Sequence, residues 1–143
     1  MQVPKHSRRT QRRGSLAVDV LLWAAAFGTV AATIAYSLGP APAALNAFPL
    51  ADKLFHAAAY GAMTFTWLLA AVWRPGRGGG VIAADGLAVV IFAVLLGGAI
   101  EIGQHFVHRS ADWFDAVADA VGAVAGYLLW VAIRSLGRGA ARE

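Results

Sequence analysis

The chain has 143 residues, of which 59% are hydrophobic and 14% charged, compared with about 45–50% and about 25% in ordinary soluble domains. With a mean hydropathy of +0.60, this composition excludes an ordinary soluble domain and predicts an integral membrane protein with room for four or five spanning helices of about 20 residues. The chain has no cysteine, which excludes disulfides and thiolate sites, and its net charge of +4 comes mostly from its ends and one loop, which argues against a nucleic-acid partner.

Four apolar segments follow one another along the chain, and each is long enough to cross a hydrocarbon core about 30 Å thick. They cover residues 16–38, 52–73, 81–107 and 114–133. Gly and Pro residues after the first segment, and the Arg74–Gly80 turn-rich stretch after the second, separate them. The predicted fold class is all-α, a four-helix transmembrane bundle over 16–134 between basic tails at 1–15 and 135–143.

The first segment also resembles a secretory signal peptide, because a basic stretch precedes it and Ala41-Pro42-Ala43 resembles a cleavage site. Its 23 residues exceed the 7–15 typical of the apolar region of a signal peptide, so the sequence favours a retained helix.

The distribution of Lys and Arg predicts the orientation in the membrane, since cytoplasmic loops are enriched in these residues. Ten of the 12 lie in the two ends of the chain and in the loop between the second and third segments, and the other side has only Lys53 and Arg109. We therefore expect a multi-pass protein of the plasma membrane with both termini cytoplasmic. The tryptophans are expected in the interfacial belts: Trp23, Trp67, Trp73, Trp113 and Trp130.

Polar side chains recur at helical spacing in the last three segments, at the ends expected on the outer face. The three stripes are Asp52, His56 and Tyr60; Glu101, Gln104, His105 and His108; and Asp112, Asp115, Asp119, Gly122 and Gly126. Gly122 and Gly126 form a small-xxx-small pattern that lets a neighbouring backbone approach closely. A tight turn is expected at 108–112, and the three stripes are expected to face the bundle interior.

Ionisable residues inside a membrane span are costly, at roughly 2.5–3.5 kcal/mol each near the bilayer centre and less toward the surface. Glu101, Asp115 and Asp119 should together cost several kcal/mol unless they are paired. Such residues are functional candidates by default.

The ordered motifs resemble the VanZ-like family of small bacterial membrane proteins. They are Asp52-Lys53-x-x-His56-x-x-x-Tyr60, Glu101-x-x-Gln104, and Arg109-Ser110 followed by Asp115, Asp119 and Gly122-x-x-x-Gly126. This chain departs from the family pattern at Asp119, where Asn is frequent, and at Val107-His108, where Pro-Gly is frequent. The family name comes from a protein associated with teicoplanin resistance, so the resemblance implies a role in the cell envelope without naming a reaction.

The first functional hypothesis is an enzyme or binding protein for a polar or phosphorylated lipid headgroup, on a membrane lipid or lipid-linked envelope precursor. Lys53, His56 and Arg109 would supply positive charge and hydrogen-bond donors for it. The predicted catalytic residues are Glu101, as general acid or base, with His56 and Asp115. The predicted substrate-binding residues are Asp52, Lys53, Tyr60, Gln104, Arg109 and Asp119.

Three other interpretations stay open. The cluster could serve non-catalytic binding or transport of a lipid, proton or ion. Four short helices offer little machinery for alternating access, so for transport we expect a homo-oligomer. It could be a buried network that holds three helices in register. It could also bind a divalent metal ion, but no dedicated motif such as HExxH is present, so the sequence assigns no cofactor. The ligands considered for that ion are His56, Glu101, His105, Asp115 and Asp119.

Simpler interpretations also apply to single residues. Asp52 and Asp112 are candidate helix caps, and Lys53 is a candidate for extension to the membrane surface. Arg109, His105 and His108 are candidates for ordinary interfacial residues.

Overall fold

The structure is a computed structural model that describes residues 5–40, 50–72, 82–107 and 112–140. These residues form four α-helices and no strand, which confirms the predicted all-α class. The helices are α1 (Lys5–Leu38), α2 (Ala51–Val72), α3 (Ile82–Phe106) and α4 (Trp113–Ala140). Both α1 and α4 continue as helix beyond the predicted apolar segments, into the basic ends of the chain.

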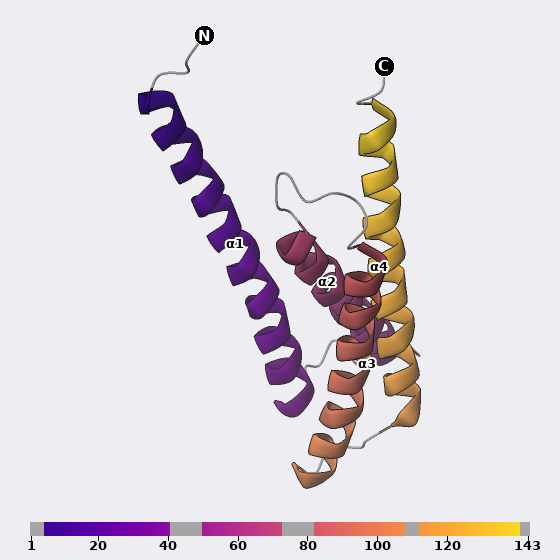
Figure 1. Cartoon of the computed structure of the whole chain (residues 1–143). Coiled ribbons are helices and arrows are strands. Elements are labelled where there is room, and N and C mark those ends of the chain that lie inside the picture. The colour runs from indigo at the N-terminus through magenta and orange to yellow at the C-terminus, as the bar shows by residue number, and fades with distance from the viewer. Residues whose placement is uncertain (1–4, 41–49, 73–81, 108–111, 141–143) are drawn as a thin grey trace.

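Each helix runs antiparallel to the one before it (Figure 1). The beginning of α1 and the end of α4 consequently lie at the same end of the bundle, and the α3–α4 connection lies at the other. We refer to these as the terminal end and the site end. The site end brings together the first turns of α2, the last turns of α3 and the first turns of α4.

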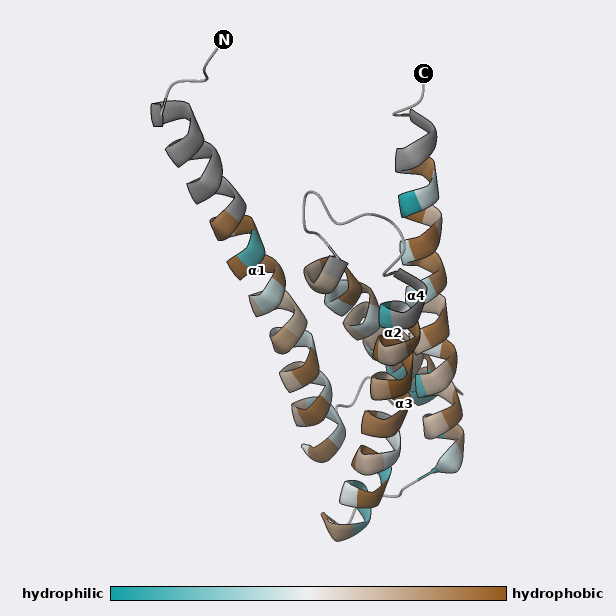
Figure 2. Cartoon of the chain, viewed as in Figure 1, coloured by the Kyte–Doolittle hydropathy of each residue, from teal (hydrophilic) through white to brown (hydrophobic). Residues whose placement is uncertain are grey.

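Every helix contains a stretch long and apolar enough to span a membrane: Leu16–Leu38, Ala51–Ala71, Asp85–Phe106 and Trp113–Leu136. Only 11% to 33% of the residues in these stretches are buried inside the bundle. Hydrophobic residues predominate along the helices (Figure 2), and many of their side chains are exposed, as expected for helices whose solvent is lipid. The chain is a multi-pass membrane protein.

Helices α2 and α4 form the most extensive contact in the bundle. Glycines on both helices allow their backbones to approach closely. A Cβ atom built on Gly122 would collide with the backbone oxygen of Ala57, and one on Gly126 would collide with that of Gly61. A Cβ on Gly61 would lie 3.2 Å from the backbone oxygen of Gly122. The predicted small-xxx-small contact is confirmed, and its partner is the backbone of α2.

Toward the terminal end, α2, α3 and α4 meet in an apolar cluster of Leu68, Val89 and Trp130. Trp130 is only 5% exposed, and the guanidinium carbon of Arg134 lies 5.2 Å from its ring centroid. Its assignment to the lipid-facing belt is wrong, because its position on α4 turns the ring toward Leu68 and Val89. Trp73 lies outside the described residues.

Helix α1 attaches to the others partly through aromatic rings. The ring of Trp67 on α2 lies 5.9 Å from Trp23 and 5.3 Å from Phe27 of α1, measured between centroids. It also lies 5.4 Å from Phe92 of α3. Such edge and tilted arrangements are those that aromatic pairs favour. Only 11% of the apolar stretch of α1 is buried, so α1 lies at the periphery of the bundle, against α2 and α3.

Candidate functional site

At the site end, Lys53 connects α2 to the start of α4. Its ammonium group donates to Asp112 at 2.6 Å and to Asp115, and it lies 3.7 Å from Asp52. The side chain of Asp115 is only 4% exposed, so this carboxylate depends on Lys53 for much of its compensation. Lys53 thus lies among three carboxylates.

His56 lies one turn deeper on α2 and pairs with α4. Its Nδ1 is 2.8 Å from Oδ1 of Asp119, and both side chains are buried, at 3% and 1% exposure. Its Nε2 lies 3.9 Å from Oδ1 of Asp52 and 3.9 Å from Oδ2 of Asp115. The imidazole is therefore surrounded by three carboxylates, at the level where Gly122 brings the two helices together.

Glu101 brings α3 into the same cluster. Its Oε2 accepts a hydrogen bond of 3.1 Å from the backbone N–H of Asp112. Asp112 precedes the first residue of α4, and its Oδ1 accepts the N–H of Phe114 at 3.0 Å. The helix-cap interpretation of Asp112 is thereby confirmed. The Lys53 ammonium hydrogen bond holds the pKa of the Asp112 carboxyl below its usual range.

Several buried polar atoms in this region have no hydrogen-bond partner among the described residues. They include Oε1 of Glu101, Oδ2 of Asp119, Oδ1 of Asp52 and the hydroxyl of Tyr60. Buried polar groups in native proteins are nearly always paired with protein, water or an ion, so these atoms point to a missing partner.

The free oxygen of Asp119 faces α3 at Gly97. A Cβ built on Gly97 would lie only 2.7 Å from Oδ2 of Asp119. Gly97 therefore makes room for this carboxylate, a role absent from the sequence analysis. The available signal was its position four residues before Glu101, which places it on the same helical face.

The charges do not balance within the described part of the site. Five carboxylates, those of Asp52, Glu101, Asp112, Asp115 and Asp119, face one lysine and one histidine. Lys53 and His56 are engaged by these carboxylates already. Among the described residues, the cluster therefore has more carboxyl groups than basic groups to pair with them.

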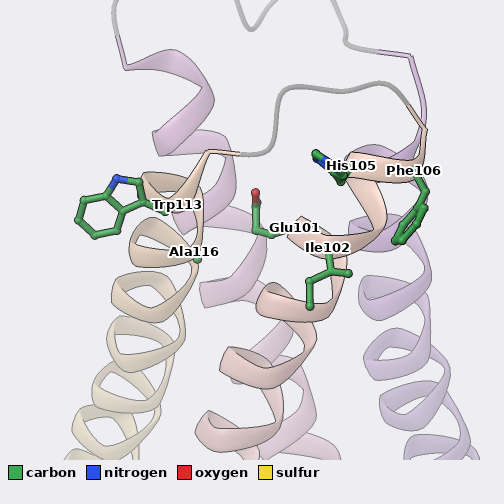
Figure 3. A pocket seen from close by; sticks show the side chains of 6 residues that line it. All are labelled: Glu101, Ile102, His105, Phe106, Trp113 and Ala116. Atoms are coloured by element: carbon green, nitrogen blue, oxygen red, sulfur yellow. The ribbon is translucent and has the colours of Figure 1, made fainter.

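A cleft of about 520 Å³ opens between α3 and α4 beside Glu101. Figure 3 shows the Glu101 side chain between Trp113 on α4 and the α3 residues Ile102, His105 and Phe106. Ile102, Phe106 and Trp113 are 66%, 76% and 67% exposed, so the mouth is apolar and faces lipid. Ala116 completes the lining. The cleft joins an apolar surface to a carboxylate.

The remaining predicted site residues lie in different surroundings. Nε2 of Gln104 donates to the backbone oxygen of Ser37 on α1, at 3.0 Å, and the side chain is buried. Tyr60 is 1% exposed and packs with Met63 and Ala93 in a buried apolar cluster, while its hydroxyl is close enough to interact with the carboxylates of Asp119 and Glu101. His105 is exposed and lines the cleft. Arg109 and His108, and most of the predicted turn at 108–112, lie outside the described residues.

Two groups of side chains within the described ranges could hold a metal ion, and they share His56. The first is Asp52, His56 and Asp115, and the second is His56, Glu101 and Asp119. In each group the three ligand atoms lie within 4.8 Å of one another. His105, considered as a ligand from the sequence, belongs to neither group.

Comparison with known proteins gives a family match. The VanZ/LLP1 family model matches residues 6–134, which is most of the chain and includes all four helices. No curated protein and no solved structure shows significant similarity.

Proposed function

This chain belongs to the VanZ/LLP1 family of membrane proteins, and we propose that its site binds the polar or phosphorylated headgroup of a membrane lipid or lipid-linked envelope precursor. The observation that carries the proposal is the cleft between α3 and α4. An amphiphile fits it because the headgroup can reach Glu101 while the tail lies against Ile102, Phe106 and Trp113. Pockets with an apolar lining and a few polar groups are typical of small-molecule sites.

The proposal places the site at the outer leaflet of the plasma membrane. Ten Lys and Arg residues in the two ends of the chain and the loop after α2 favour cytoplasmic termini, and the site end lies opposite the termini (Figure 1). Lipid-linked precursors of the envelope are present at that leaflet. This location is where a VanZ-like protein could influence susceptibility to a glycopeptide such as teicoplanin.

Glu101 is the residue we propose for proton transfer if the bound lipid is also converted. It borders the cleft, its Oε2 is fixed by the Asp112 N–H, and its Oε1 has no hydrogen-bond partner. His56 and Asp115, whose Nε2 and Oδ2 atoms lie 3.9 Å apart, would exchange protons with each other as a further acid–base pair of the site. A carboxyl group held in position at the edge of a cleft meets the geometric requirement for a general acid or base.

A blocked cleft tests the binding proposal. The full chain is delipidated in detergent and incubated with a polyprenyl phosphate, phosphatidylglycerol or phosphatidylcholine, and retained lipid is counted by native mass spectrometry. Ala116→Trp should fill the cleft and remove the retained lipid. Val117→Trp is the matched control, because Val117 is the next residue of α4 and is 44% exposed on the lipid-facing surface. Equal lipid retention by both variants would contradict the proposal.

Conversion is tested separately with Glu101→Gln, which keeps the size of the side chain. The variant should fold with the stability of the wild type but release no product from a lipid that the wild type converts. If Glu101 has only a structural role, the main effect will instead be a lower unfolding temperature in detergent.

A further inference from the structure

We propose that His56, Glu101 and Asp119 form a binding site for one divalent first-row metal ion, such as Zn²⁺ or Mn²⁺. The three residues come from α2, α3 and α4, so the ion would connect three helices inside the membrane-spanning part of the bundle. One imidazole and two carboxylates are ligands that such ions accept.

The three side chains are already assembled. One ligand atom from each lies within 4.8 Å of the other two. His56 and Asp119 are 3% and 1% exposed, which shields the site from bulk water, while Glu101 borders the cleft that provides access. Carboxylates held this close in a low-dielectric environment repel one another unless a proton or a cation lies between them.

Lys53 distinguishes the two groups of metal-capable residues. Its ammonium group contacts Asp52 and Asp115 of the first group, and so already serves as the cation there. The second group, His56, Glu101 and Asp119, has no comparable lysine or arginine contact among the described residues. The second group is therefore where a further positive charge is needed.

An independent feature points to the same place. Oδ2 of Asp119, in a side chain that is 1% exposed, has no hydrogen-bond partner, and neither has Oε1 of Glu101. Because Oδ1 of Asp119 is paired with His56, Oδ2 is the oxygen left to bind an ion, with the Tyr60 hydroxyl as its neighbour on α2. The missing Cβ of Gly97 leaves the space that this oxygen requires.

The ion also gives the site a way to accept phosphate. Without it, a phosphorylated headgroup would meet an excess of carboxylates; with it, phosphate oxygens could bind a cation at the edge of the cleft. This last step rests on the proposed function, whereas the ion site rests on its own residues.

Metal uptake by the purified full chain tests the inference. The protein in detergent is treated with a chelator, exchanged into metal-free buffer and titrated with Zn²⁺ or Mn²⁺ by calorimetry, with bound metal counted by mass spectrometry. The wild type should take up one ion per chain. Since loss of an outer-shell partner alone weakens metal binding about 10–100-fold, His56→Ala and Asp119→Asn should bind at least about tenfold more weakly.

Two matched controls accompany these variants. Asp85→Asn makes the same chemical change at the terminal end of α3, and His105→Ala removes an exposed imidazole that belongs to neither metal-capable group. Both should bind one ion as the wild type does. No stoichiometric uptake by the wild type, or equal affinity in wild type and Asp119→Asn, would overturn the proposal.

A second measurement covers variants that fold poorly. Added metal should raise the unfolding temperature of the wild type but not that of Glu101→Gln, and an equal rise in both would overturn the site. Lipid retention is then measured on both the metal-loaded and the chelated protein. Metal uptake with no lipid retained by either form would support the ion site and reject the proposed function. Lipid retention by a wild type that takes up no metal would support the proposed function and reject the ion site.

Discussion

The two ends of the α2–α3–α4 unit are held together by different interactions. At the terminal end, Leu68, Val89 and Trp130 form an apolar contact. At the site end, the same three helices meet through Lys53, His56 and the surrounding carboxylates. The terminal end shows that the same three helices can also meet through apolar packing. Because a polar cluster inside a membrane span is costly by comparison, the site end is the candidate functional site.

The largest expected effect comes from replacing Lys53, the only lysine at the site end. Lys53→Met leaves the 4%-exposed Asp115 carboxylate without its ammonium partner. Breaking a buried ion pair on one side typically costs 3–5 kcal/mol, and since Lys53 is itself 25% exposed we expect a loss of about 3 kcal/mol in the free energy of unfolding. The measurement is reversible unfolding in mixed detergent micelles.

The double variant Lys53→Met/Asp115→Asn sharpens this result. Removing both charges should recover more than half of the lost stability, because the carboxylates that still lack Lys53, those of Asp52 and Asp112, are 34% and 39% exposed and remain hydrated. If the losses in free energy of unfolding of the two single variants simply add, Lys53 and Asp115 are not coupled. The site end would then not be held together by this ion pair.

The second prediction concerns the glycine contact between the two ends. Gly122→Ala places a methyl group on the backbone oxygen of Ala57, so α4 must move away from α2. We expect a loss of about 2.5 kcal/mol, near the upper end of the range for overpacked sites. Because Gly122 lies one turn after Asp119, metal binding should weaken as well.

Gly98→Ala is its matched control. A Cβ at Gly98 would have nothing within 4 Å, so the change should be neutral or raise stability by up to about 1 kcal/mol through helix propensity. If both glycine variants behave alike, close approach at Gly122 is not what joins α2 to α4.

The third prediction concerns the apolar cluster at the terminal end. Trp130→Ala removes the ring that packs on Leu68 and Val89, and should cost about 2 kcal/mol. This is less than the 3–5 kcal/mol seen in water-soluble cores, because lipid is itself apolar and helix association in a bilayer gains only packing. Metal and lipid binding should stay at wild-type levels, measured as above. A loss of either binding at unchanged stability would remove the distinction between the two ends.

Much of the fold follows from the sequence because a bilayer imposes simple requirements. Apolar length fixed the four spans, and the 3.6-residue period placed Asp115 and Asp119 on one face. The Gly122–Gly126 spacing predicted a close contact for the same reason. These features depend on one helix at a time, and no knowledge of the partner helix is needed.

The contacts between helices were harder to predict, since they depend on the relative rotation and depth of two elements. The sequence alone does not show that Lys53 of α2 contacts Asp112 and Asp115 at the start of α4, or that Gly97 of α3 faces Asp119. Trp130 was misassigned for this reason: tryptophan in a span is common at the interface, and only the position of α2 and α3 shows that this one is buried.

Gln104 gives the smallest predicted effect and separates the site from its border. Its helical spacing from Glu101 suggested a substrate contact, but its amide nitrogen donates to the Ser37 backbone oxygen and so ties α3 to α1. Gln104→Met keeps the volume and loses this hydrogen bond, which is worth about 1 kcal/mol. Hydrogen exchange should detect the change as faster opening of the last turn of α1, while the α2–α4 contact keeps its protection. Equal loss of protection in α2 and α4 would mean that α1 opens together with the site. The site end would then be a cooperative unit of all four helices.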